Sequence, residues 1–168
     1  MLLPPYFMKN VFTPTETYHK ISDISLYYLM NDLNIKGLIF DFDGTLLLKR
    51  KISVETLDFI KKAKEFGFKI SILSNNIYVS NTILRTLKID TTKRFALKPL
   101  KKPFLNMAQR MKLPPEKIAV IGNNRISDIF GANRSGMCSI YIQNNMNRFI
   151  NKRKTENMLK NNGIKHID

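Results

Sequence analysis

The chain is poor in cysteine, in long apolar runs and in acidic residues, and each of these scarcities excludes some classes of protein. Its 168 residues include one cysteine, Cys138, so no disulfide can form within the chain. That composition agrees with a reducing compartment. No apolar run approaches the roughly 20 residues that a bilayer-spanning helix needs. The amino terminus has neither a basic region nor a long apolar segment, so we expect no secretory signal and a cytoplasmic protein.

Acidic residues are also scarce, with 13 Asp and Glu against 28 Lys and Arg and a formal net charge of +15. Such a charge attracts nucleic acid, an anionic membrane face or phosphorylated substrates. The alternative is a solvated lysine-rich surface with no specific partner. No pattern of aromatic and basic residues typical of RNA-binding modules is present, so nucleic acid is the least favoured partner.

The 43% hydrophobic content is enough for one globular domain over residues 1–168. Within it we distinguish an N-terminal extension, residues 1–35, and a basic C-terminal tail, residues 147–168. The tail mixes basic and apolar residues. It is either an ordinary solvated helix or a helix that lies on a membrane.

Strands and helices alternate along the predicted fold. Apolar runs predict buried strands at 38–40, 69–73, 118–121 and 139–142. Start and stop signals predict helices from Thr13, from Ser53 to Gly67, through 79–87, from Pro103 to Met111, and over 128–134. Apolar strands joined by helices indicate a three-layer α/β fold with a parallel central sheet.

Polar residues follow three of the predicted strands, and Lys98 follows the apolar run 95–97. They are Asp41 and Asp43, then Ser74 and Asn75, then Lys98, and finally Asn123 and Asp128. Strand ends in such a fold meet at one edge, where ligands bind. Each group alone has an ordinary explanation as a turn, a helix cap or a surface lysine. Lys101 and Lys102 are alternative candidates for the role of Lys98. Their joint order predicts an active site.

These residue types match the needs of phosphoryl transfer. Asp41 is suited to be a nucleophile that forms an acyl phosphate, and Asp43 to be the general acid and base. Ser74 can hold phosphoryl oxygens, and Lys98 can neutralise charge in the transition state. Mg²⁺ prefers oxygen ligands, which Asp41 and the backbone carbonyl of Asp43 can offer.

The segment from Leu38 to Thr45, with Ser74 and the Lys98-Pro99 pair, resembles the motifs of the haloacid dehalogenase (HAD) superfamily. Within that superfamily, the chain resembles the YqeG family of HAD subfamily IIIA phosphatases over nearly its whole length. Further segments follow that family's pattern: Leu3-Pro4, Ser74 to Asn76, Ile121-Gly122, Gly131 to Gly136, and the tail near Arg148.

The resemblance implies a Mg²⁺-dependent phosphatase that acts on a phosphomonoester, with phosphatidylglycerophosphate as the candidate substrate. It implies substrate contacts from Gly44, Thr45 and Asn75. The connections after Asp43 and after Ser74 are short, so the enzyme is expected to lack the cap domains inserted there in relatives. An open site suits a bulky or membrane-presented substrate, and we therefore expect a protein that is cytoplasmic or peripheral to an anionic membrane.

One position departs from the family pattern. The fourth motif normally begins Gly-Asp, whereas this chain has Gly122-Asn123, followed by Arg125 and Asp128. The metal ligands expected from the resemblance are Asp41, Asp43, Asn123 and Asp128, with one negative charge fewer than usual. Two hypotheses follow, a working phosphatase or a weak or inactive domain that binds a phosphorylated ligand or a partner.

Overall fold

The computed structural model describes residues 10–48, 51–79, 81–89 and 91–143. The predictions made for Leu3-Pro4 and for the basic tail, residues 147–168, lie outside these residues.

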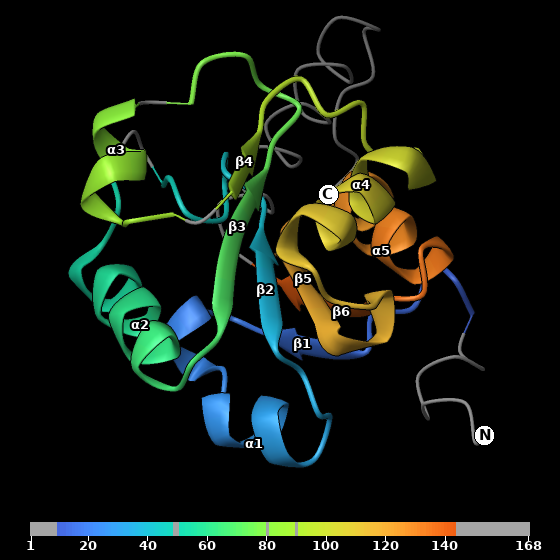
Figure 1. Cartoon of the computed structure of the whole chain (residues 1–168), viewed down its shortest axis with the longest axis horizontal. Helices are drawn as coiled ribbons and strands as arrows, with labels where there is room; N and C mark the ends of the chain where they lie inside the picture. Colours follow the sequence, from blue (N-terminus) through green and yellow to red (C-terminus); the bar gives the residue numbers. More distant parts are fainter. Residues whose placement is uncertain (1–9, 49–50, 80, 90, 144–168) are drawn as a thin grey trace, which may run out of the picture.

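Six parallel strands form one central sheet in the order β1-β6-β5-β2-β3-β4 (Figure 1). In chain order they are β1 (Glu16–Tyr18), β2 (Gly37–Phe40), β3 (Lys69–Leu73), β4 (Thr91–Lys93), β5 (Ile118–Gly122) and β6 (Cys138–Ile142). Central β2 pairs with β3 on one side and β5 on the other, with Phe40 in register with Ile72 and Ile121. The ends of these three strands therefore lie next to one another.

Helices cover both faces of the sheet. They are α1 (Leu26–Asn31), α2 (Val54–Glu65), α3 (Asn81–Thr86), α4 (Lys101–Met111) and α5 (Gly131–Arg134). Short 3-10 helices occupy Ile21–Asp23 and Pro115–Lys117, and a π-helical turn, Arg125–Phe130, leads into α5. α2 and α3 lie on one side, while α4 and α5 lie on the other (Figure 1).

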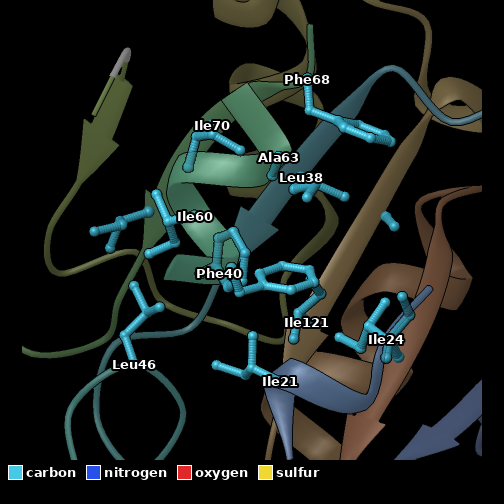
Figure 2. Packing of buried hydrophobic residues seen from close by; sticks show 14 of the residues in the cluster. Ile21, Ile24, Leu38, Phe40, Leu46, Ile60, Ala63, Phe68, Ile70 and Ile121 are labelled. Carbon is cyan, nitrogen blue, oxygen red and sulfur yellow. The ribbon is translucent and has the colours of Figure 1, made fainter. Parts of the chain in front are cut away.

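The core has two parts because strand side chains alternate between faces. Leu38 and Phe40 of β2 belong to the larger cluster under α2, with Ile60 and Ala63 (Figure 2). Ile39 points to the opposite face and joins a smaller cluster of residues from α4, β5 and α5: Phe104, Met107, Met111, Val120 and Ala132. This two-sided burial explains why the strand runs are apolar throughout rather than alternating.

The α/β prediction is confirmed, as are the four predicted strands. The helix predicted to begin at Thr13 is wrong. Thr15 instead bonds to β6, its N–H donating to the Ser139 carbonyl over 2.8 Å, and the chain continues as edge strand β1. The sequence offers no signal for this long-range pairing. Strand β4 was not predicted because Thr91–Lys93 is short and polar.

The fold is also capless over the described residues. The connection from β2 to α2 spans only residues 41–53, and that from β3 to α4 contains only α3 and β4. Among these residues, therefore, no cap domain covers the carboxyl ends of the strands.

Candidate active site

A buried ion triad lies at the carboxyl edge of the sheet. The Lys98 ammonium contacts Asp41 Oδ1 and Asp128 Oδ1, each at 2.7 Å. The side chains of Lys98, Asp41 and Asp128 are only 2%, 11% and 0% exposed. Two carboxylates share one cation, so the triad carries one net negative charge when all three groups are ionised.

Adjacent strand ends bring these groups together. Asp41 follows β2 directly, and its N–H donates to the Ile121 carbonyl of β5. Asp128 reaches the same point from the π-helical turn, which Asn124 caps by accepting from the N–H groups of Ile126 and Ser127. A Cβ on Gly122 would lie 2.4 Å from the Asp128 carboxylate, so this glycine leaves room for that side chain.

The triad shifts the ionisation of its members. Burial, and then the neighbouring Asp128 charge, raise the pKa of Asp41 to about 6, although Lys98 acts in the opposite direction. For Lys98, burial lowers the pKa, but the carboxylates of Asp128 and Asp41 outweigh burial and raise it overall. Lys98 therefore stays charged, and Asp41 is ionised near neutral pH but not far below it.

Asp43 lies on the solvent side of the same loop. Its Oδ2 accepts a hydrogen bond from the Asn76 amide at 3.0 Å. Next to it, Gly44 has φ +81, and a Cβ there would lie 2.2 Å from the Asn123 amide nitrogen. This close approach lets Thr45, itself buried, donate to Asn123 Oδ1 at 3.3 Å.

The loop after β3 positions both Ser74 and Lys98. Ser74 is buried, and its Oγ accepts from the Asn76 N–H. Asn75 holds the Lys98 backbone, donating to its carbonyl at 3.1 Å and accepting from its N–H at 2.7 Å. The rival lysines, Lys101 and Lys102, are exposed on α4.

An open pocket of about 620 Å³ adjoins the triad, lined by Asp43, Asn75, Asn123, Asn124, Arg125, Ile126, Ser127 and Tyr141. The Arg125 guanidinium lies 4.6 Å from the centre of the Tyr141 ring. Exposed Arg125 thus places a positive charge at the pocket wall, opposite in sign to Asp43.

The oxygen donors at this edge are compatible with Mg²⁺, which prefers hard oxygen ligands. Asp41 offers a carboxylate, Asp43 a backbone carbonyl, and Asn123 an amide oxygen. Within the described residues, however, no group of three or more His, Cys, Asp or Glu could hold a metal ion. The donor set fits the ion in type, with less negative charge than a three-carboxylate site.

Some residues at the site were not among the residues predicted from the sequence. Asn76 contacts both Asp43 and Ser74, and its position next to Asn75 is the signal that could have identified it. Asn124 could have been found in the same way beside Asn123. Nothing in the sequence marks Tyr141 as a pocket residue, because it belongs to an apolar strand. It lies at the pocket because its strand pairs it with Gly122.

Comparison with known proteins gives a family match. The model described as mitochondrial PGP phosphatase matches residues 6–147. A curated relative from Bacillus subtilis (strain 168), described as "Probable phosphatase YqeG", is 30% identical over 145 residues, covering 83% of this chain and 76% of the relative.

Solved structures support the fold. An uncharacterized protein from Listeria monocytogenes serotype 4b matches with a TM-score of 0.55 and 24% identity, over 66% of this chain and 79% of that one. An uncharacterized protein from Corynebacterium glutamicum ATCC 13032 Kitasato matches with a TM-score of 0.55 and 22% identity, over 80% and 99%. The motifs and the family match together show that this chain belongs to the HAD superfamily, in the family described as mitochondrial PGP phosphatase, and is a homologue of YqeG.

Proposed function

We propose that this protein hydrolyses a phosphomonoester through an aspartyl-phosphate on Asp41, with Mg²⁺ bound. The observation that carries the proposal is the buried triad, in which Lys98 holds Asp41 at 2.7 Å. A carboxylate beside a fixed cation at an open strand edge is suited to attack phosphorus, where negative charge must be neutralised.

In the first step, an Asp41 oxygen forms a bond to phosphorus as the bond from phosphorus to the leaving oxygen breaks. Asp43, in its protonated form, gives its proton to the leaving alkoxide. In the second step, Asp43 takes a proton from water, which attacks the phosphoryl group and releases Asp41 with inorganic phosphate. The exposure of Asp43 at the pocket supports this role, since it can meet both alcohol and water.

The phosphoryl oxygens need donors and positive charge. The Ser74 hydroxyl already accepts a hydrogen bond from the Asn76 N–H, which leaves its own hydrogen available for a phosphoryl oxygen. Thr45 and the backbone at Gly44 lie next to Asp43 and are proposed as further contacts. Asn75 positions Lys98, because its amide makes two hydrogen bonds to the lysine backbone.

Asp41, the Asp43 carbonyl and Asn123 would hold Mg²⁺, which when bound supplies charge neutralisation at the phosphoryl group. Both Asp128 oxygens are engaged, Oδ1 by Lys98 and Ser127 and Oδ2 by the Asn124 N–H. We therefore assign Asp128 to holding Lys98 rather than to direct metal binding.

For the substrate we propose a lipid phosphomonoester, phosphatidylglycerophosphate, reached at an anionic membrane surface. The family match, the open pocket and the net charge of +15 support this choice. No helix among the described residues could cross a bilayer. The membrane contact that we propose is a peripheral one.

Asn123 favours a second candidate, a weak or inactive domain that binds a phosphorylated ligand. An amide in place of the expected acid removes a negative charge beside the proposed metal, and Arg125 adds a positive one nearby. Both changes weaken attraction for a divalent cation.

The test is phosphate release from phosphatidylglycerophosphate in mixed micelles, with Mg²⁺ or with EDTA. Wild type should release phosphate only with Mg²⁺, and Asp41→Asn should lose at least a hundredfold. The matched control is Asp58→Asn, which changes an exposed aspartate on α2 and should keep the wild-type rate. Equal rates for wild type and Asp41→Asn would sink the phosphatase proposal, while lipid binding without turnover would support the second candidate.

A further inference from the structure

Exposed apolar residues gather at the edge of the sheet where the candidate active site opens. They come from the loop after β3, the connection from β4 to α4, and the pocket wall, and each is more than half exposed. We call them the apolar rim: Ile77, Tyr78, Phe95, Leu97, Leu100 and Ile126. Single exposed apolar residues are ordinary, but a group of them at one place indicates an interaction surface.

Backbone hydrogen bonds hold the two rim loops side by side. The Ser74 N–H donates to the Lys93 carbonyl at 3.0 Å, and the Ala96 N–H donates to the Ser74 carbonyl at 2.9 Å. The Phe95 N–H reaches the Asn76 carbonyl at 3.3 Å. Both loops cross the carboxyl edge of the sheet, at the top of Figure 1. The rim is therefore attached to the residues that form the candidate site.

The backbone presents two of these side chains in an unfavourable conformation. Phe95 has φ 48 and Leu97 has φ 59, in the left-handed region that bulky residues rarely adopt. Ala96 between them is buried, at 4% exposure, whereas Phe95 and Leu97 face solvent. Such conformations persist where the surrounding structure imposes them, and they concentrate at functional positions.

The rim lies among basic residues. Residues 91–102 include Lys93, Arg94, Lys101 and Lys102 and contain no Asp or Glu. Lys93, Lys101 and Lys102 are exposed, and α4 begins with the last two. Apolar side chains flanked by Lys and Arg are typical of surfaces that bind anionic bilayers, where both the hydrophobic effect and charge attraction contribute.

We propose that the apolar rim inserts into the interface of an anionic lipid bilayer and turns the pocket mouth toward the headgroups. This orientation rests on the proposed lipid substrate, which could then enter the capless site without leaving the membrane. Vesicle binding itself requires no catalysis. A second copy of the chain, or its own residues 144–168, are the other occupants that the experiment tests.

The absence of tryptophan from the chain allows a direct spectroscopic test. Tyr78→Trp places a single fluorophore at a residue that is 84% exposed. Its emission should shift to the blue with vesicles of phosphatidylglycerol and phosphatidylcholine, but not with phosphatidylcholine alone. The matched control is Tyr27→Trp, 67% exposed on α1 at the opposite edge, which should show no shift (Figure 1). No shift at Tyr78→Trp, or emission already blue-shifted without vesicles, would overturn the proposal.

A second set of variants measures partition into the same vesicles by co-sedimentation. Phe95→Asn and Leu97→Asn remove apolar area, yet asparagine tolerates positive φ, so the loop keeps its conformation. Each should weaken partition by about tenfold, and Lys101→Gln by about fivefold. Tyr27→Ser should bind as wild type does, and unchanged partition of the two asparagine variants would refute the rim as the binding surface.

The two proposals fail in different ways. If wild type binds anionic vesicles but releases no phosphate from any ester, the proposed function fails and the rim proposal stands. If wild type hydrolyses a water-soluble ester but does not bind vesicles, the rim proposal alone fails.

Discussion

Replacing Lys98 with methionine tests the buried triad without reference to any substrate. The substitution keeps most of the side-chain volume but removes the cation that contacts Asp41 and Asp128 at 2.7 Å each. Two buried carboxylates are then left facing each other. Breaking a buried ion pair by removing one partner typically costs about 3–5 kcal/mol. We therefore expect Lys98→Met to lower the free energy of unfolding by about 3 kcal/mol at pH 8.

The stability lost in Lys98→Met should depend on pH, because Asp41 titrates near neutral pH. The pKa of Asp41 is about 6 in the folded protein, against an ordinary value of 3.8, so the folded state binds this proton more tightly than the unfolded state does. In wild type, protonation of Asp41 therefore raises the free energy of unfolding as the pH falls from about 6 toward 4. Because Lys98 acts to lower the pKa of Asp41, its loss moves that pKa above 6. Between pH 8 and 6.5, the variant should then regain stability as pH falls, by up to about 1.4 kcal/mol per pH unit.

Urea unfolding at several pH values between 6.5 and 8 measures these differences. The urea concentration at the midpoint reports stability where the m value is the same for wild type and variant. Lys102→Met, which changes an exposed lysine on α4, is the matched control and should stay within about 0.5 kcal/mol of wild type. Adding Asp128→Asn to Lys98→Met should restore at least ~1 kcal/mol at pH 8, since it removes one of the unpaired carboxylates. A loss that does not vary with pH, or one as small as that of Lys102→Met, would refute the coupled triad.

Four further outcomes follow, three at the same edge of the sheet and one inside strand β3. Asn123→Asp should lower the Mg²⁺ concentration for half-maximal activity by about tenfold by restoring a carboxylate; an unchanged requirement in a Mg²⁺ titration would remove Asn123 from the metal site. Phosphate release at low Mg²⁺ should fall about tenfold per pH unit below pH 6, as Asp41 becomes protonated, and a flat acid limb would contradict the assignment of Asp41 as nucleophile. Gly122→Ala should lower activity and should lower the free energy of unfolding by about 1–3 kcal/mol, the usual cost of overpacking, because its Cβ would lie 2.4 Å from Asp128. Thermal unfolding at the wild-type temperature would contradict this. Ser71→Ala should raise stability by about 1 kcal/mol, because this fully buried Ser71 hydroxyl has no hydrogen-bond partner among the described residues, and a loss of stability would indicate an unseen partner.

The layer order and the chemistry available at the sheet edge follow from the amino-acid sequence alone. Apolar runs such as 38–40 have the composition of strands buried on both faces, and the residues that follow them must meet where parallel strands end. Ser53 and Gly67 mark the bounds of α2 because a side-chain cap and a positive φ are local requirements. The identities of Asp41, Asp43, Ser74 and Lys98 carried the family resemblance on their own.

The contacts between those residues, by contrast, come from the three-dimensional fold. Strand β1 exists because Thr15 pairs with Ser139 across the chain, a partner that no local pattern specifies. Strand register carries Tyr141 to the pocket, and the hydrogen bonds of Asn75 select Lys98 over its exposed neighbours. The shared cation, the raised pKa of Asp41 and the apolar rim all depend on distances between segments far apart in sequence. Local propensity has no access to such distances, because packing and strand pairing set them.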